Sequence, residues 1–198
     1  MLITKEKCKD YSDTELVELT LKKQDYFFCL IKRYEDSLLR YIRRISSTSK
    51  EDAEDILQEV FISAYKNLND FDRNLKFSSW IYRITHNKTI SHWRKIRVRP
   101  KEVFSSEYEN EGLFNLIIDE KNNPLKNIED KCSEKQIQFI INSLEEKYRD
   151  VLILKYLEDK SYREISDILK KPMGTIATLL NRSKKKFLSK IKENNIIF

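Results

Sequence analysis

Glycine and proline are scarce in this 198-residue chain, which has two and three of them respectively. All-β architectures need turn residues at regular intervals, so this scarcity argues against them. No apolar run approaches the roughly 18 residues that a membrane-spanning helix needs, and the N-terminal residues lack an apolar stretch of signal-peptide length. Lys, Leu, Ile and Glu dominate instead, and such a composition is typical of helices. The sequence therefore predicts a helical, cytoplasmic protein.

Cysteine is also scarce, and its pattern indicates neither a disulfide framework nor a zinc site. Cys8, Cys29 and Cys132 are an odd number, lie far apart and form no C-x-x-C pair, so we expect reduced thiols that lie partly in cores. His86 and His92 are six positions apart and do not share a helical face, so no metal site is expected. No glycine-rich phosphate loop or nucleophile–base arrangement is present. We therefore expect no cofactor, no small-molecule substrate and no enzymatic activity.

Charge is unevenly distributed along the chain, whose formal net charge is +6. Residues 51–59 hold five acids and no base, whereas residues 73–101 hold nine bases and no acid. Residues 101–133 hold eight acids against four bases, and residues 170–192 hold eight bases and no acid. Blocks of one sign indicate separate surfaces for separate partners, and the two basic blocks favour contact with nucleic acid at two places.

The hydrophobic pattern predicts an all-α fold of two small helical domains, residues 12–97 and 132–194, joined by a flexible linker over residues 98–131. Ser12 and Glu15 fit a capping box at the first helix, and Ser49 fits a cap before an apolar stripe. The C-terminal domain is expected to be a four-helix domain with a helix-turn-helix. We expect helices at about 25–45, 51–68, 78–97, 132–144, 145–157, 162–169 and 175–194.

The C-terminal stretch "SYREISDILKKPMGTIATLLNRSKKKF" predicts two short helices, with Pro172 and Gly174 supplying the break between them. Two interpretations fit the spacing equally well. In one, the second helix enters a DNA major groove and lysines after it attract phosphates. In the other, the stretch is a plain helical hairpin with a solvated basic end. The candidate DNA contacts on the second helix and the basic run are Gly174, Thr175, Ala177, Thr178, Asn181, Arg182, Lys184, Lys185 and Lys186.

A second basic stretch, "FSSWIYRITHNKTISHWRKIRVR", interleaves aromatic and basic residues. Aromatic rings beside cations suit single-stranded nucleic acid, because bases stack on rings. Alternatively, Trp80, Ile81 and Ile84 belong to a core. The bases of this stretch, among them Arg83, Arg94 and Arg97, are harder to explain as core residues.

Together, "DAEDILQEVF" followed by "FSSWIYRI", and then the hairpin, closely resemble an extracytoplasmic-function (ECF, group IV) RNA polymerase sigma factor of the sigma-70 family. The resemblance covers about residues 12–97 and 134–192. It implies a first domain that binds core RNA polymerase and melts the −10 promoter element, and a second that reads the −35 element as duplex. It also implies an anti-sigma protein as a partner. The alternative is a helix-turn-helix transcription regulator that acts without docking on core polymerase.

The resemblance also assigns roles to individual residues. Acids among residues 51–59 match positions with which the family docks on polymerase. Acids near a helix N-terminus also compensate the helix dipole, so both roles can hold for these residues. The loop "FDRNLKFSS" matches the segment that receives a flipped base, although Phe71 can instead close the core. The family often has glycine at Lys170 and polar or basic residues at Ala177 and Leu179, so its −35 sequence does not carry over. The implied contacts are Asp52, Asp55, Gln58 and Glu59 for polymerase, Asn74, Phe77, Ser78, Trp80, Arg83, Asn87, Lys88, Arg94 and Lys95 for the −10 element, and Arg163, Gly174, Thr175, Ala177, Thr178, Asn181, Arg182, Lys184 and Lys185 for the −35 element.

Overall fold

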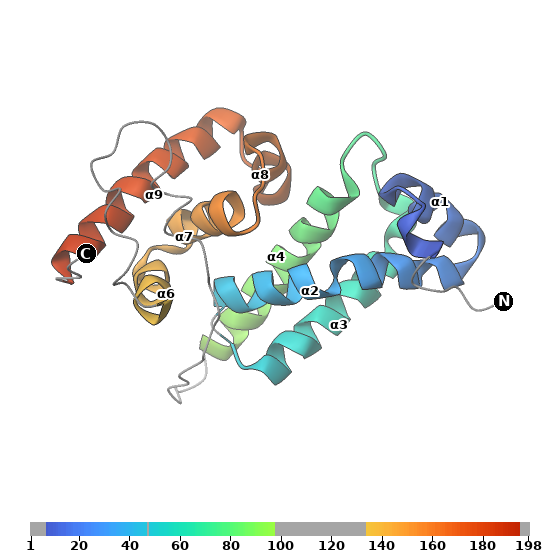
Figure 1. Cartoon of the computed structure of the whole chain (residues 1–198), viewed down its shortest axis with the longest axis horizontal. Coiled ribbons are helices and arrows are strands. Elements are labelled where there is room, and N and C mark those ends of the chain that lie inside the picture. The colour runs from blue at the N-terminus through green and yellow to red at the C-terminus, as the bar shows by residue number, and fades with distance from the viewer. Residues whose placement is uncertain (1–6, 47, 98–133, 195–198) are drawn as a thin grey trace. The chain divides into compact units, whose positions relative to one another are not determined.

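The computed structural model describes residues 7–46, 48–97 and 134–194, and every regular element within these ranges is a helix (Figure 1). The chain divides into two compact units, with α1 to α4 in the first and α6 to α9, apart from three residues of α8, in the second. The prediction of an all-α fold with two helical domains is thereby confirmed. The predicted linker, residues 98–131, lies outside the described residues, as does Cys132.

The first unit consists of three long helices and a shorter one. The helices α2, α3 and α4 pack against one another, and α1 contacts both α2 and α4. Leu38, Tyr41 and Ile42 of α2 are fully buried, as are Ala64 of α3 and Ile81 of α4. The elements are η1 (Lys7–Lys9), α1 (Asp13–Lys22), η2 (Gln24–Tyr26), α2 (Phe27–Ser46), α3 (Lys50–Lys66), η3 (Leu68–Asp70) and α4 (Phe77–Arg97).

Side chains at the helix starts explain where these helices begin. The Ser12 hydroxyl accepts a hydrogen bond from the Glu15 amide, and the Glu15 carboxylate accepts one from the Ser12 amide, so the predicted capping box forms. The Ser49 hydroxyl accepts a hydrogen bond from the Asp52 amide and so caps α3. The helix begins at Lys50, one residue earlier than predicted. Within α4, the buried hydroxyls of Thr85 and Thr89 donate to carbonyls one turn back, which satisfies them in the core.

Over residues 134–194, the second unit consists of one long helix and four shorter elements. The last helix packs on α7 and also contacts α6. Its buried residue Phe187 joins Ile140, Leu152 and Ile165 from the other helices in one core. The predicted helix at 145–157 ends in a π-helical turn rather than continuing as α-helix. The elements are α6 (Glu134–Ser143), α7 (Glu146–Leu152), η4 (Ile153–Leu157), α8 (Tyr162–Leu169) and α9 (Met173–Glu193). In the described parts of the chain, no helix is long and apolar enough to cross a membrane.

The expectation of reduced thiols is wrong for two of the three cysteines. Cys8 and Cys29 form a disulfide across 21 positions of sequence, with their Cα atoms 5.1 Å apart. Both are buried, and the bond joins the η1 turn to α2. The pairing escapes sequence analysis because it depends on how the chain before α1 folds back on α2, and cysteine spacing carries no information about that.

Candidate polymerase and nucleic-acid interfaces

One side of α3 is an exposed acidic face, which we define as Asp55, Gln58, Glu59 and the apolar Ile62. All four side chains are exposed, and 55% of Ile62 is open to solvent. The opposite side buries Ala53, Ile56, Val60 and Ala64 against the other helices. The fourth predicted docking residue, Asp52, is half-buried at the start of the helix and accepts a hydrogen bond from Thr48 (3.2 Å). Ile62 was not among the predicted docking residues, although the sequence shows that it lies outside the apolar stripe of the helix.

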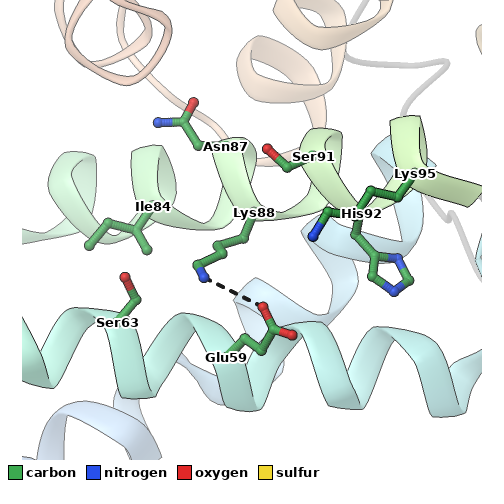
Figure 2. A pocket seen from close by; sticks show the side chains of 8 residues that line it. All are labelled: Glu59, Ser63, Ile84, Asn87, Lys88, Ser91, His92 and Lys95. Carbon is green, nitrogen blue, oxygen red and sulfur yellow. Dashed lines mark hydrogen bonds and ion pairs between the residues drawn. The ribbon is translucent and has the colours of Figure 1, made fainter.

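A shallow cavity of about 370 Å³ lies between α3 and α4 (Figure 2). Glu59 and Lys88 meet across it, with 3.4 Å between carboxylate oxygen and ammonium nitrogen. The fold therefore brings one predicted polymerase contact beside one predicted DNA contact. More than half of the Glu59 side chain is exposed, so this ion pair is worth little and either partner can exchange it for another. The cavity is lined by Glu59, Ser63, Ile84, Asn87, Lys88, Ser91, His92 and Lys95.

A basic face runs along the outer side of α4. By helical spacing Arg83, Asn87 and Arg94 lie on one side, and Lys88 and Lys95 lie beside them. Asn87, Lys88 and Lys95 also line the cavity. Asn87, Arg94 and Lys95 are exposed, whereas Arg83 and Lys88 are half-buried. These predicted contacts thus form one continuous surface. The side chain of Arg97 lies outside the described residues.

Three aromatic rings, one directly after η3 and two at the start of α4, close the core of the first unit. The ring centroids of Phe71 and Phe77 are 5.6 Å apart, and the Trp80 centroid is 5.3 Å from Phe71 and 5.5 Å from Phe77. Phe77 is 3% exposed and Trp80 5% exposed. This burial argues against the prediction that Phe77 and Trp80 contact DNA, because neither ring presents a face to a base. Phe71 takes the alternative role that the sequence left open.

The loop at residues 72–76 remains accessible above this cluster. Its Asn74 is exposed, and both the amide and the side-chain nitrogen of Asn74 donate to Asp72 at 2.9 Å. That turn presents the loop tip to solvent, and Ser78 is half-buried beside it at the start of α4. Of the three residues predicted to receive a flipped base, Asn74 and Ser78 are therefore in reach and Phe77 is not.

The turn between α8 and α9 differs from the prediction in where its break lies. Lys170 ends α8 in the left-handed conformation (φ 52°, ψ 47°), a region that favours glycine. Pro172 is the N-cap of α9, so Gly174 lies inside the first turn of the helix and not in the break. A Cβ added at Gly174 would meet nothing within 4 Å. Lys170 itself thus adopts the left-handed conformation, in the place where the family often has a glycine.

Replacing Lys170 with glycine is expected to stabilise the second unit by up to about 1 kcal/mol, because a side chain in the left-handed region costs about that much. Far-UV circular dichroism of the full chain during urea unfolding measures this change. Tryptophan fluorescence isolates the first unit, which contains both tryptophans. Lys171→Gly is the matched control, because Lys171 has no positive φ. Equal unfolding midpoints for the two variants would contradict the strain assigned to Lys170.

The predicted contacts on α9 lie on its exposed side, away from the buried Ile176, Leu180 and Ser183. Thr175, Ala177, Asn181 and Arg182 are exposed, as are Arg163 on α8, Thr178 and Lys185. The Thr178 hydroxyl donates to the Gly174 carbonyl (2.9 Å) and keeps its lone pairs for an acceptor role. Leu179 is half-buried, so it joins the core only in part.

Two of the three consecutive lysines on α9 are engaged within the unit. Lys184 lies over the Tyr156 ring, 5.4 Å from its centroid. Lys186 donates to Glu145 (2.6 Å) and lies 4.7 Å from the centroid of the Tyr148 ring. Lys185 is exposed. The basic run is therefore not the uniformly solvated end that one of the two interpretations of the sequence expected, since two of its members help to hold α9 on the unit.

Hydrogen bonds from Lys186 and then Lys147 lower the pKa of Glu145 to about 2, from 4.5. A carboxylate with a depressed pKa in the folded state stabilises that state above pH 4.5, and this contribution is lost as the pH falls toward 2. Wild type is therefore expected to unfold at higher temperature than Glu145→Gln at pH 6, with the difference shrinking as the pH falls. Circular dichroism at several pH values measures it. Asp159→Asn, which removes an exposed carboxylate outside this cluster, should give no such trend.

Comparison with known proteins decides the family. The family Sigma-70 region 2 matches residues 30–99, and the family Sigma-70, region 4 matches residues 134–187. The ECF RNA polymerase sigma factor SigW of Bacillus subtilis is 35% identical over 86% of this chain and 91% of its own length. The chain belongs to the ECF RNA polymerase sigma factors. It is thus an alternative sigma factor, which directs transcription initiation and so regulates transcription.

Further relatives of this sigma factor agree in length and fold. The ECF RNA polymerase sigma-E factor of Escherichia coli K12 is 29% identical over 91% of this chain and 95% of its own length. A structure of CnrH in complex with the cytosolic domain of CnrY matches with a TM-score of 0.67 at 19% identity, covering 92% of this chain and 99% of that one. The sigma factor RpoE of Bartonella quintana, solved with the anti-sigma factor NepR, matches with a TM-score of 0.64 at 18% identity, covering 84% and 96%. These structures share the fold of the sigma factor.

Proposed function

We propose that the acidic face of α3 docks on core RNA polymerase. The face combines two exposed carboxylates with an exposed isoleucine, whereas the side of the helix with Ala53, Ile56, Val60 and Ala64 is buried in the unit. An apolar contact surrounded by charge is the composition of a specific protein interface, and the charges steer association with a basic partner surface. Dipole compensation alone does not need acids this far along, since Glu59 lies in the third turn of α3.

The basic face of α4 and the loop at residues 72–76 then bind and melt the −10 element. Arg83, Arg94 and Lys95 hold the phosphate backbone, and Asn87 and Lys88 add polar contacts beside it. A base leaves the stack and is received between Asn74 and Ser78, where hydrogen bonds offset the cost of unstacking. In this proposal the buried rings of Phe77 and Trp80 support the residues that receive the base, and neither ring stacks on the base.

The second unit reads the −35 element as duplex DNA. Its helix α9 starts at Met173 with a proline N-cap that provides no side-chain hydrogen bond, so the amides of the first turn remain available to a phosphate. The open space around Gly174 lets the backbone approach that phosphate closely. Asn181 and Arg182 then face the major groove, where such side chains read adenine and guanine edges.

Four further assignments are part of the proposal. We assign the sigma factor to group IV and to the cytoplasm, where core polymerase and promoters are. It performs no catalysis, since the polymerase carries out the chemistry. An anti-sigma protein covers the docking surfaces until a signal releases it, and the sigma factor RpoE has been solved in complex with an anti-sigma factor, NepR. Co-purification from the native cell under non-inducing conditions tests the last point, and free sigma factor would count against it.

Run-off transcription from a random promoter library tests the proposal. With core polymerase and the sigma factor present, the selected templates should share two boxes at fixed spacing, the downstream one rich in easily unpaired steps. Selected templates that share only a single box would instead support the helix-turn-helix regulator. So would equal enrichment of the same templates when the sigma factor binds them without polymerase. The single observation that carries the proposal is that acidic and basic faces lie on neighbouring helices of one unit while a second basic helix belongs to the other.

A further inference from the structure

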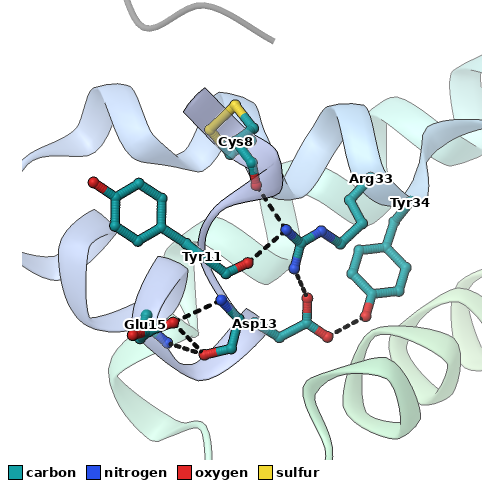
Figure 3. A network of polar contacts seen from close by, with 8 residues as sticks. Cys8, Tyr11, Asp13, Glu15, Arg33 and Tyr34 are labelled. Atoms are coloured by element: carbon teal, nitrogen blue, oxygen red, sulfur yellow. Dashed lines mark hydrogen bonds and ion pairs between the residues drawn. A yellow bond between two sulfur atoms is a disulfide. The ribbon is translucent and has the colours of Figure 1, made fainter. Parts of the chain in front are cut away.

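The segment before α1 is tied to α2 at several points (Figure 3). We call residues 7–13 the N-terminal strap. The Cys8–Cys29 disulfide fixes its first turn, and the Arg33 guanidinium donates to the carbonyls of Cys8 (2.8 Å) and Tyr11 (2.7 Å). The same guanidinium donates to the Asp13 carboxylate (2.6 Å), at the first residue of α1. One arginine and one disulfide therefore set the position of the strap and of the start of α1.

The strap and the helix α1 that follows it are connected to the loop at residues 72–76 by two routes. Asp13 also accepts a hydrogen bond from the Tyr34 hydroxyl (2.5 Å), and the Tyr34 ring lies 5.5 Å from that of Phe77, directly after the loop. Burial and the Asp13 carboxylate raise the pKa of Tyr34, so its hydroxyl stays a donor. Along the second route, Glu18 of α1 pairs with Arg73 of the loop at 3.0 Å. A change in the position of the strap is thus passed to Arg73 and to Phe77, which lie on either side of Asn74.

From these contacts we propose that the Cys8–Cys29 disulfide is a redox switch that sets the order of the strap and of the loop, and so the efficiency of promoter melting. The inference rests on the proposed role of that loop. Disulfides in compartments that hold DNA and polymerase are generally reduced unless they are transient or serve as redox sensors. A disulfide on a short terminal strap suits a sensor, because its loss frees the strap while the packed helices α2 to α4 remain folded.

The chemistry is thiol–disulfide exchange with a small dithiol or with oxidised glutathione. In reduction, a thiolate of the dithiol attacks the Cys8 sulfur, forms a mixed disulfide and releases the Cys29 thiolate, which takes up a proton. The second thiol of the reductant then displaces Cys8, so two electrons pass to the protein and the dithiol becomes a disulfide. Oxidation by glutathione disulfide runs the exchange backwards and releases two molecules of glutathione. Local opening of the three-residue η1 turn gives the reagent access to Cys8.

The test compares full-length sigma factor oxidised with glutathione disulfide and reduced with dithiothreitol, each combined with core polymerase and a selected promoter. Alkylation of free thiols followed by mass spectrometry confirms the state of the pair. Reduction is expected to increase hydrogen exchange in the strap and in the loop by about tenfold, and to lower the yield of open complexes by about fivefold. Binding to core polymerase should stay unchanged, because the acidic face of α3 is not tied to the strap.

Two variants make the result specific. Cys8→Ser should behave like the reduced protein under both conditions, whereas Cys132→Ser should respond to the reagents as wild type does. Unchanged hydrogen exchange in the loop after verified reduction overturns the switch, whether or not open complexes form. Equal yields of open complexes in both states overturn its effect on melting. Absence of open complexes in both states, with exchange in the loop still responding to reduction, counts against the proposed melting role of the loop and leaves the thiol-dependent ordering supported.

Discussion

Replacing Asp55 and Glu59 together with lysine is expected to weaken the complex with core RNA polymerase by about 100-fold or more. Both carboxylates lie exposed on the acidic face of α3, and reversing a charge at a complementary interface replaces attraction with repulsion, at a cost of about 2–5 kcal/mol for a well-desolvated contact. Neither residue contributes to the core, so the fold should be unaffected. Competition against a labelled sigma factor for core polymerase measures the loss, and circular dichroism verifies folding.

The matched control is Asp36→Lys combined with Asp70→Lys. This pair makes the same change in net charge at exposed positions of the same unit that lie outside α3. If the control binds core polymerase like wild type and Asp55→Lys/Glu59→Lys does not, the position of the charges matters and not their sum. Equal affinity of all three proteins would show that the acidic face is not the docking surface.

Substitution of Asn181 and Arg182 with alanine is expected to lower transcription that depends on the −35 element by at least about 30-fold, since each good contact to a base edge contributes about 1–3 kcal/mol of discrimination. Both side chains are exposed on the outer side of α9, and nothing in the core of the unit relies on them. Binding to core polymerase and melting of a promoter that is already opened at the −10 element should be retained. Transcription from the selected promoter, with and without its upstream box, measures the effect.

Lys192→Ala controls for lost positive charge on the same helix. Lys192 is exposed ten residues beyond Arg182, which places it about 15 Å further along α9. This variant should lose only the modest, salt-dependent attraction to phosphate that every cation near DNA provides. A comparable loss in Lys192→Ala and in the double variant would mean that α9 contributes charge and no sequence reading.

Local signals made most of the helical architecture predictable. The capping box at Ser12 and Glu15 and the cap at Ser49 are short-range chemistry, and the structure has both. The apolar stripe of α3 predicted its buried side, which in turn left its acids outside. These features depend on residues within one turn of each other, and the sequence lists those residues side by side.

Features that depend on tertiary contacts were not predictable in the same way. The sequence of the stretch after Phe77 favours core positions for Trp80 and Ile84 but leaves an aromatic platform open, and only the packing of Phe71, Phe77 and Trp80 decides for core. The Cys8–Cys29 bond and the contact of Glu59 with Lys88 join residues 21 and 29 positions apart, beyond any helical period. Lys170 shows another limit, since its left-handed conformation is one that the residue type disfavours.

Permanganate footprinting of a selected promoter, bound by core polymerase with this sigma factor, tests the central claim most directly, because the reagent attacks only unpaired thymines. We expect reactive thymines within the downstream box, a fully paired upstream box protected from nuclease by α9, and no reactivity when either core polymerase or the sigma factor is left out. Reactive thymines in the upstream box, or protection of that box at the same concentration without polymerase, would contradict it.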